Sequence, residues 1–162
     1  MNVLSWSLQR VSQTGLALAV AAVVSLPLVT QLSAGSALAP SDDFVTGGGW
    51  ITGTPTGARA NFGVKGGVDV DGSFFGHLNY VDHETNLHVK AESVTNYVIV
   101  NATTRRIDGT ATIDGVSGFT FTVTVSDAGE PGTADTFAIS LSSGYTATGT
   151  LQGGNIQLHV DV

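Results

Sequence analysis

Three carboxylates in one short segment, DAGEPGTAD (residues 127–135), have the clearest capacity for chemistry in this sequence. Ca²⁺ takes about six to eight oxygen ligands, and carboxylates and carbonyls of such a loop can supply them. The spacing differs from that of an EF-hand. A turn is the alternative, because EPGT (130–133) fits a type II turn while the flanking acids accept hydrogen bonds from loop amides. We favour the turn and keep Asp127, Glu130 and Asp135 as a candidate Ca²⁺ site.

A second polar group suggests zinc, since imidazole and carboxylate are zinc ligands. It comprises His77, Asp82, His83, Glu84 and His88. We expect a hairpin that pairs Tyr80 with Leu87. In that hairpin His77 and His88 share one face but lie two residue pairs apart, and His83 falls in the turn. A solvated polar face is therefore the favoured interpretation.

No catalytic motif places a nucleophile beside a base. The sequence lacks a Gly-x-Ser-x-Gly elbow, and the two carboxylates of a glycosidase cannot be paired from spacing because they meet only in the fold. We therefore expect a protein without catalytic activity, with a secreted polysaccharide-acting enzyme as the alternative.

Four aromatic residues could stack on a sugar if their rings are exposed: Trp50, Tyr80, Tyr97 and Tyr145. Trp50 and Tyr80 are the candidate ligand-binding residues. Three of the four fall in apolar register, so packing in the core is the competing interpretation.

The elements that must position these groups are strands. Apolar residues recur at every second position from Ile107 to Val125, which predicts two half-buried strands joined by a tight loop. A five-residue loop sets Ile113 opposite Phe119 and Ala111 opposite Phe121. A two-residue turn at Asp114-Gly115 is the alternative that we do not favour.

Similar alternation along residues 44–160 predicts an all-β domain, an antiparallel meander of about nine or ten strands that forms a sandwich or a closed barrel. The strand of Phe137, Ile139 and Leu141 should pair with the one from Phe121 to Val125. Gly144 should take a left-handed conformation in a three-residue hairpin loop. The glycines at 47–49 should allow Trp50 or a neighbouring strand to lie close to the backbone.

The first 39 residues predict a secretory signal peptide. They contain one charged side chain, Arg10, then an apolar run at 15–28 that is short for a membrane span, then a small-residue segment. Cleavage after Ala39, Ala37 or Ser36 fits this segment. We therefore expect a single exported domain over residues 40–162, at the cell surface or outside the cell, with no stable membrane span after cleavage.

The charge of that domain excludes some partners. All 13 acidic side chains and five of the six basic ones follow residue 39, which leaves a side-chain charge of −8. Such a charge disfavours nucleic acid and anionic membranes as partners. The chain has no Cys, so its stability must come from a packed core.

Five segments together resemble the bacterial post-COAP domain family, whose members follow choice-of-anchor domains in exported surface proteins. They are VTGGGWI (45–51), ANFG (60–63), GHLNYVDH (76–83), DAGEPG (127–132) with DTF (135–137), and GGNI (153–156). The resemblance spans about residues 44–160 and implies an extracellular bacterial β-domain of unestablished activity, so no catalytic residue is carried over from it. Unlike the multidomain members, this sequence has its signal directly before the domain.

These observations predict a non-catalytic bacterial module, secreted or at the cell surface, with a binding or structural role. A glycan or cell-wall polymer is the expected ligand in preference to a protein. A Ca²⁺-stabilised structural scaffold is the alternative, and Ca²⁺ is the one cofactor considered.

Overall fold

The computed structural model describes residues 43–160, which form one sheet of nine antiparallel strands without a helix. The strands are β1 (Phe44–Ile51), β2 (Ala60–Val68), β3 (Phe74–Asp82), β4 (Leu87–Ile99), β5 (Thr104–Ile113), β6 (Val116–Ser126), β7 (Thr136–Leu141), β8 (Thr146–Thr150) and β9 (Gly153–His159). The predicted all-β class is thus confirmed, whereas the predicted signal peptide lies outside the described residues. None of the described residues forms a helix of the length and apolar character needed to cross a bilayer.

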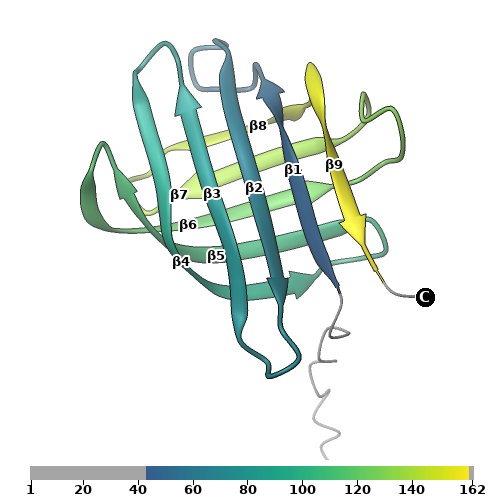
Figure 1. Ribbon diagram of the computed structural model, residues 1–162. Coiled ribbons are helices and arrows are strands. Elements are labelled where there is room, and N and C mark those ends of the chain that lie inside the picture. Colours follow the sequence, from purple (N-terminus) through teal and green to yellow (C-terminus); the bar gives the residue numbers. More distant parts are fainter. Residues whose placement is uncertain (1–42, 161–162) are drawn as a thin grey trace, which may run out of the picture. The chain divides into compact units, whose positions relative to one another are not determined.

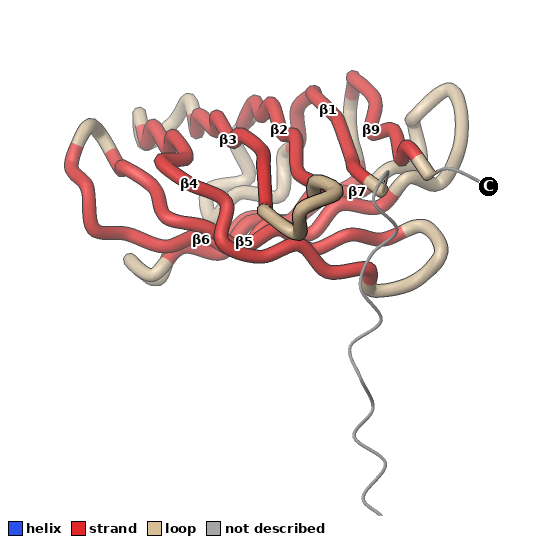
Figure 2. The backbone as a smooth tube through the Cα atoms, turned by 60° about the horizontal axis from the view of Figure 1, so that its bottom comes forward, coloured by secondary structure: helices blue, strands red, loops and turns tan. Residues whose placement is uncertain are grey.

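The sheet curls so that its two halves face each other. Strands follow the order β8-β7-β6-β5-β4-β3-β2-β1-β9, so β9 returns to pair with β1. Figure 1 shows β9, β1, β2 and β3 crossing in front of β5 to β8, and Figure 2 shows the two layers from another side. We call the layers the front half (β9, β1, β2, β3 and the start of β4) and the back half (β5 to β8).

Strand β4 connects the two halves because it bends. Its first residues pair with β3, and its length from Val89 to Ile99 pairs with β5. Two register shifts, between Ala91 and Ser93 and between Val94 and Asn96, interrupt the β4–β5 ladder. Bulges of this kind increase local twist and bend a strand, which lets one sheet form both layers.

The core lies between the halves and is built by the inward residues of each strand. Phe137 of the back half stacks on Phe62 of the front half at 3.9 Å between ring centroids. The Tyr80 ring centroid lies 6.0 Å from that of Phe137. Gly66 faces inward, and a Cβ there would come within 2.6 Å of the Ile107 side chain. Burial of each large apolar side chain stabilises the fold by about 1.5–3 kcal/mol.

The predicted β5–β6 register is wrong by two residues. Ala111 pairs with Phe119 and Gly109 with Phe121. The connection is the two-residue turn that we did not favour: Asp114 and Gly115 both have positive φ, as a type I′ turn requires. A bulge between Ala111 and Ile113 adds the residue that restores the alternation, so Ala111 and Phe121 both face the core as predicted.

The β3–β4 hairpin shows the same error. Tyr80 pairs with Val89, and Leu87 pairs with Asp82, because β3 continues to Asp82 and the turn is confined to residues 83–86. A shift of two residues leaves the faces unchanged. The predicted pairing of β6 with β7 is confirmed, as is the left-handed Gly144.

The glycines of β1 take the predicted role. A Cβ on Gly49 would lie 2.4 Å from the carbonyl oxygen of Gly153 in β9, and a Cβ on Gly153 would lie 2.6 Å from Nε1 of Trp50. The absence of side chains therefore lets β9 approach β1 closely and lets the Trp50 indole lie against β9.

Candidate functional site

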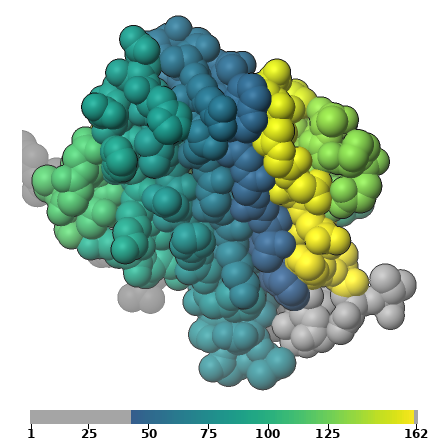
Figure 3. Space-filling view, turned by 45° about the horizontal axis from the view of Figure 1, so that its top comes forward, coloured from purple at the N-terminus to yellow at the C-terminus, as the bar shows by residue number. Residues whose placement is uncertain are grey.

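The outward side chains give the two halves different surfaces. The front face is defined by the outward residues of the front half: Gly153, Asn155, Gln157 and His159 on β9, Phe44, Thr46, Gly48 and Trp50 on β1, Asn61, Gly63, Lys65 and Gly67 on β2, Phe75, His77, Asn79 and Val81 on β3, and His88 and Lys90 on β4. The back face comprises Thr104, Arg106, Asp108, Thr110, Thr120, Thr122, Thr124, Ser126, Thr136, Ala138, Ser140, Thr146, Thr148 and Thr150. Figure 3 shows β9 lying directly against β1, with β2 and β3 beyond it.

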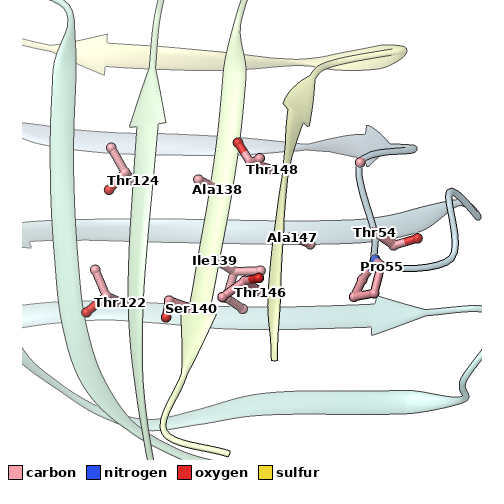
Figure 4. Close-up of a pocket in the computed structure, with 11 residues that line it drawn as sticks. Thr54, Pro55, Thr122, Thr124, Ala138, Ile139, Ser140, Thr146, Ala147 and Thr148 are labelled. Carbon is pink, nitrogen blue, oxygen red and sulfur yellow. The ribbon is translucent and has the colours of Figure 1, made fainter. Parts of the chain in front are cut away.

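The back face contains a shallow hollow of about 460 Å³ over β6, β7 and β8. Figure 4 shows its side chains, which include Thr124, Ser140 and Thr148, with Thr54 and Pro55 at the β8 side. The segment at 53–55 is held there because the amide of Thr148 donates to the carbonyl of Gly53 at 3.0 Å. Hydroxyls both donate and accept hydrogen bonds, but the lining contains no titratable group. The hollow can bind polar groups and supplies no acid or base.

One edge of this hollow ends in a closed polar network around Asp108. Its carboxylate accepts hydrogen bonds from the Thr122 hydroxyl at 2.9 Å, from Asn96 Nδ2 at 3.0 Å and from Arg106 Nε at 3.2 Å. The charges of Asp108 and Arg106 therefore neutralise each other on the back face.

The upper part of the front face, at the Ile51 end of β1, is built around Trp50. The guanidinium of Arg59 lies 4.5 Å from the centroid of the indole, in a cation–π contact. Arg59 Nε also donates to Asn61 Oδ1 at 3.1 Å, and His83 Nε2 lies 2.8 Å from the same oxygen. Trp50 is half-buried, with the exposed Arg59 over its ring and Gly153 of β9 beside its Nε1.

The lower part of the front face, at the Phe44 end of β1, carries a pair of phenylalanine rings. Phe44, Gly67 and Phe75 are neighbours across three strands, and the ring centroids of the two phenylalanines are 6.4 Å apart. A Cβ on Gly67 would lie 2.5 Å from Phe75 and 2.6 Å from Phe44, so only glycine leaves room for both rings. Lys65 Nζ lies 5.7 Å and 5.2 Å from their centroids, and His159 stacks on Phe44 at 4.2 Å.

Between these two parts the front face is open and rich in amides. Asn79 and Gln157 are exposed, as are His77 and Lys90. Gly63 lies at the centre, where the nearest atom to an added Cβ is His77 Nε2 at 4.0 Å. Amide side chains, imidazoles and ammonium groups thus surround an uncovered strip of backbone.

The candidate calcium residues are engaged by amides. Asp135 is fully buried, and its carboxylate accepts the amides of Ala128 and Ile156, both at 2.8 Å. Asp127 accepts the amides of Gly129 at 2.9 Å and of Leu158 at 3.0 Å.

Glu130, the third of these residues, accepts Nδ2 of Asn155 at 2.9 Å. The 127–135 segment therefore closes the free edge of β9, which would otherwise expose unpaired amides. Within residues 43–160 no group of three or more His, Cys, Asp or Glu side chains is placed to hold a metal ion.

The turn inside this segment differs from the predicted type II turn. The Glu130–Pro131 peptide bond is cis, and the amide of Gly132 donates to the carbonyl of Gly129 at 3.1 Å. A cis-proline at the third position of a four-residue turn defines a type VI turn. The turn thus spans residues 129–132, one residue earlier than predicted.

Sequence reasoning missed a buried ion pair that joins the halves. Asp43, just before β1, accepts hydrogen bonds from Arg105 of β5 at 2.8 and 2.6 Å and from the Tyr97 hydroxyl at 2.5 Å. Burial would raise the pKa of Asp43, but the hydrogen bonds from Arg105 and Tyr97 and the Arg105 charge lower it below its usual value. The available signal was the position of Arg105 in the inward register of Ile107.

A second buried carboxylate, Asp82, explains where Tyr80 lies. Tyr145 donates to Asp82 Oδ2 at 2.9 Å, and the hydroxyls of Tyr80 and Tyr145 are 2.7 Å apart, so Tyr80 donates to Tyr145. Tyr80 has an exposed fraction of 0 %, and burial raises its pKa to about 12. Its ring therefore cannot stack on a sugar in this structure, because it packs in the core.

The pKa of Asp82 is lowered although burial alone would raise it. The hydrogen bond from Tyr145 and those from the amides of Glu84 and Thr85 stabilise its charged form. Asp82 thus points inward, away from the imidazoles of His77 and His88 on the front face. The favoured interpretation of those histidines as part of a polar face agrees with this arrangement.

Comparisons with known proteins give no evidence about function, so the proposal below depends on the sequence and the structure. No family model matches the chain, and no match was found among the curated proteins or the solved structures.

Proposed function

We propose that the protein is an exported, non-catalytic module that binds a glycan or cell-wall polymer through its front face. The observation that carries the proposal is the combination on one open face of Trp50, the amides Asn61, Asn79 and Gln157, and bare backbone at Gly63. Aromatic rings pack on the apolar faces of sugars, and amides both donate to and accept from hydroxyls. The resemblance to post-COAP domains supports an extracellular location and stays a prediction.

The hollow on the back face is a second candidate for the same function. Its hydroxyls suit a neutral polyol, but it contains no aromatic ring among its lining residues. We therefore rank it below the front face.

We also propose that the two halves are best classed as a sandwich, since β8 and β9 form the two ends of the strand order.

A glycan array tests the proposal. The protein, produced from the full-length sequence with its own leader, is expected to bind at least one polysaccharide and to release no reducing sugar from it. Trp50→Ala should weaken that binding about tenfold, equivalent to about 1.4 kcal/mol, while Thr148→Val on the back face should leave it unchanged. Absence of binding to every glycan would contradict the proposal, and hydrolysis of any of them would favour the enzyme alternative.

A further inference from the structure

The described basic side chains are unevenly distributed between the two faces. There are five: Arg59, Lys65, Lys90, Arg105 and Arg106. Arg105 is buried against Asp43, and Arg106 pairs with Asp108, and these are the ion pairs within residues 43–160. The remaining three cations all lie on or beside the front face.

Acidic side chains are absent from the outward positions of the front face. Three of the four histidines in the sequence, His77, His88 and His159, occupy such positions instead. Carboxylates occur at its border: Glu84 in the β3–β4 turn, Glu92 exposed on β4 two residues after Lys90, Asp114 beside the His88 amide, and Glu130 beside Asn155. A domain with a side-chain charge of −8 thus presents one face whose outward positions carry cations and no carboxylate.

We propose that the front face binds an extended anionic polysaccharide that carries carboxylates at intervals along its chain. This inference rests on the proposed function and names the class of glycan. Lys65, Lys90 and Arg59 would attract the carboxylates, while Asn79, Gln157 and the Trp50 indole would contact the sugars between them. Complementary charge increases the association rate and selects the partner.

The size of the face favours a polymer over a single small anion. Phe44 and Trp50 are six residues apart on β1, which corresponds to about 20 Å along a strand. Arg59 and Lys65 are separated by the same number of residues. Lys90 lies two strands away from Lys65 and two residues further along, at about 12 Å. Three cations along about 20 Å suit a polymer whose carboxylates are several ångströms apart.

The same spacing argues against nucleic acid and membranes. Double-stranded DNA carries one charge per about 1.7 Å, a density that would be repelled by the acidic remainder of the domain. The central front face also presents amides and histidines in place of the apolar side chains that insert into a bilayer.

Two forms of one polymer provide the test. Polygalacturonate and its methyl-esterified form have the same sugar backbone and differ in charge. Affinity electrophoresis or calorimetry of the full-length product should show binding to polygalacturonate at least tenfold tighter than to the ester. Raising NaCl from about 50 to 200 mM should weaken it, since exposed charges are screened by salt.

Substitutions locate the charges. Lys65→Gln with Lys90→Gln should weaken binding to polygalacturonate about five- to tenfold, as expected for two exposed ion pairs. Arg106→Gln removes one positive charge from the back face and should change binding less than Lys65→Gln does. Lys65 and Lys90 are exposed and Arg106 is partly exposed, and an unchanged unfolding midpoint would show that each variant folds.

The outcomes separate this inference from the proposed function. Equal affinity for polygalacturonate and its ester would overturn the anionic specificity and leave a glycan-binding module. Binding to no polysaccharide would overturn both. Tighter binding to a single-stranded DNA oligomer, or to vesicles of anionic phospholipid, would overturn the assignment of the polymer class.

Discussion

The front and back faces are outer surfaces of the same curled sheet, yet they have different chemistry. The back face is almost entirely Thr and Ser, and its one cation, Arg106, is neutralised by Asp108. The front face has aromatic rings, amides, imidazoles and cations without carboxylate partners. Hydroxyl-bearing β-branched residues are sufficient to cover an outer sheet face, as the back face shows. The side chains of the front face are therefore not explained by the needs of the fold alone, and this supports the proposed binding function.

The buried ion pair of Arg105 and Asp43 joins the two halves, so Arg105→Met should have the largest effect on stability. The substitution leaves Asp43 buried without its cation, which costs about 3–5 kcal/mol of unfolding free energy. Urea denaturation should show one transition at a lower midpoint. Arg106→Met, the same change at a partly exposed neighbour, should cost less than about 1 kcal/mol. Two separate transitions in the parent protein would contradict a single unit.

Tyr145→Phe should have the next largest effect, because it removes the hydroxyl that links β8 to Asp82 of β3. Loss of a hydrogen bond to a charged group costs about 1.5–3 kcal/mol. The substitution should also alter the dependence on pH. Asp82 has a lowered folded-state pKa, so its contribution is complete above the ordinary Asp value of about 3.9 and is lost as pH falls through the lowered value.

Unfolding free energies between about pH 5 and pH 2 measure this effect. The parent should lose stability on acidification, and Tyr145→Phe should lose less because one cause of the lowered pKa is gone. The same loss in both proteins would show that Tyr145 does not stabilise the Asp82 carboxylate.

Gly67→Ala should destabilise the protein through the front face alone. The added methyl would contact Phe44 and Phe75 at less than 3 Å, and overpacking of this kind costs about 1–3 kcal/mol. Gly63→Ala on the same strand meets no atom closer than 4.0 Å and should be neutral or stabilising. Thermal unfolding measures both. Equal midpoints would mean that the phenylalanine pair is not constrained by Gly67.

The acidic segment should give the smallest effect. Asp127→Asn retains an acceptor for the amide of Leu158 and loses only the strength that the charge adds, about 1 kcal/mol. Because amides already satisfy Asp127 and Asp135, the unfolding midpoint should be the same in EDTA and in millimolar Ca²⁺ at matched ionic strength. A Ca²⁺-dependent rise that Asp127→Asn abolishes would establish the metal site instead.

Alternation along the chain was enough to predict which residues face the core, because a strand places every second side chain on the same side. It could not determine the register between strands, since a shift of two residues leaves every side chain on the same face of the sheet. Asp114 and Asn86 show the difficulty: both are non-glycine residues with positive φ, and each tightens a turn that the pattern made longer.

The candidate site was only partly visible in the sequence. Trp50 and its glycines were recognised, but the front face joins β9 to β1 across more than 100 residues, and no local pattern contains that pairing. Tyr80 looked equivalent to Trp50 until its hydroxyl was found in the chain of hydrogen bonds to Asp82. Arg105 stood in apolar register without a visible partner, because Asp43 lies 62 residues away.

The most direct measurement is the titration of the ¹⁵N-labelled protein with a short galacturonate oligomer, followed by amide and indole NMR shifts. Shifts should concentrate on the Trp50 indole and on the amides of Gly48, Gly63 and Asn79, whereas Thr124, Ser140 and Thr148 should stay unchanged. Shifts confined to those back-face residues, or none at a concentration of oligomer that saturates binding by calorimetry, would contradict the assignment of the front face.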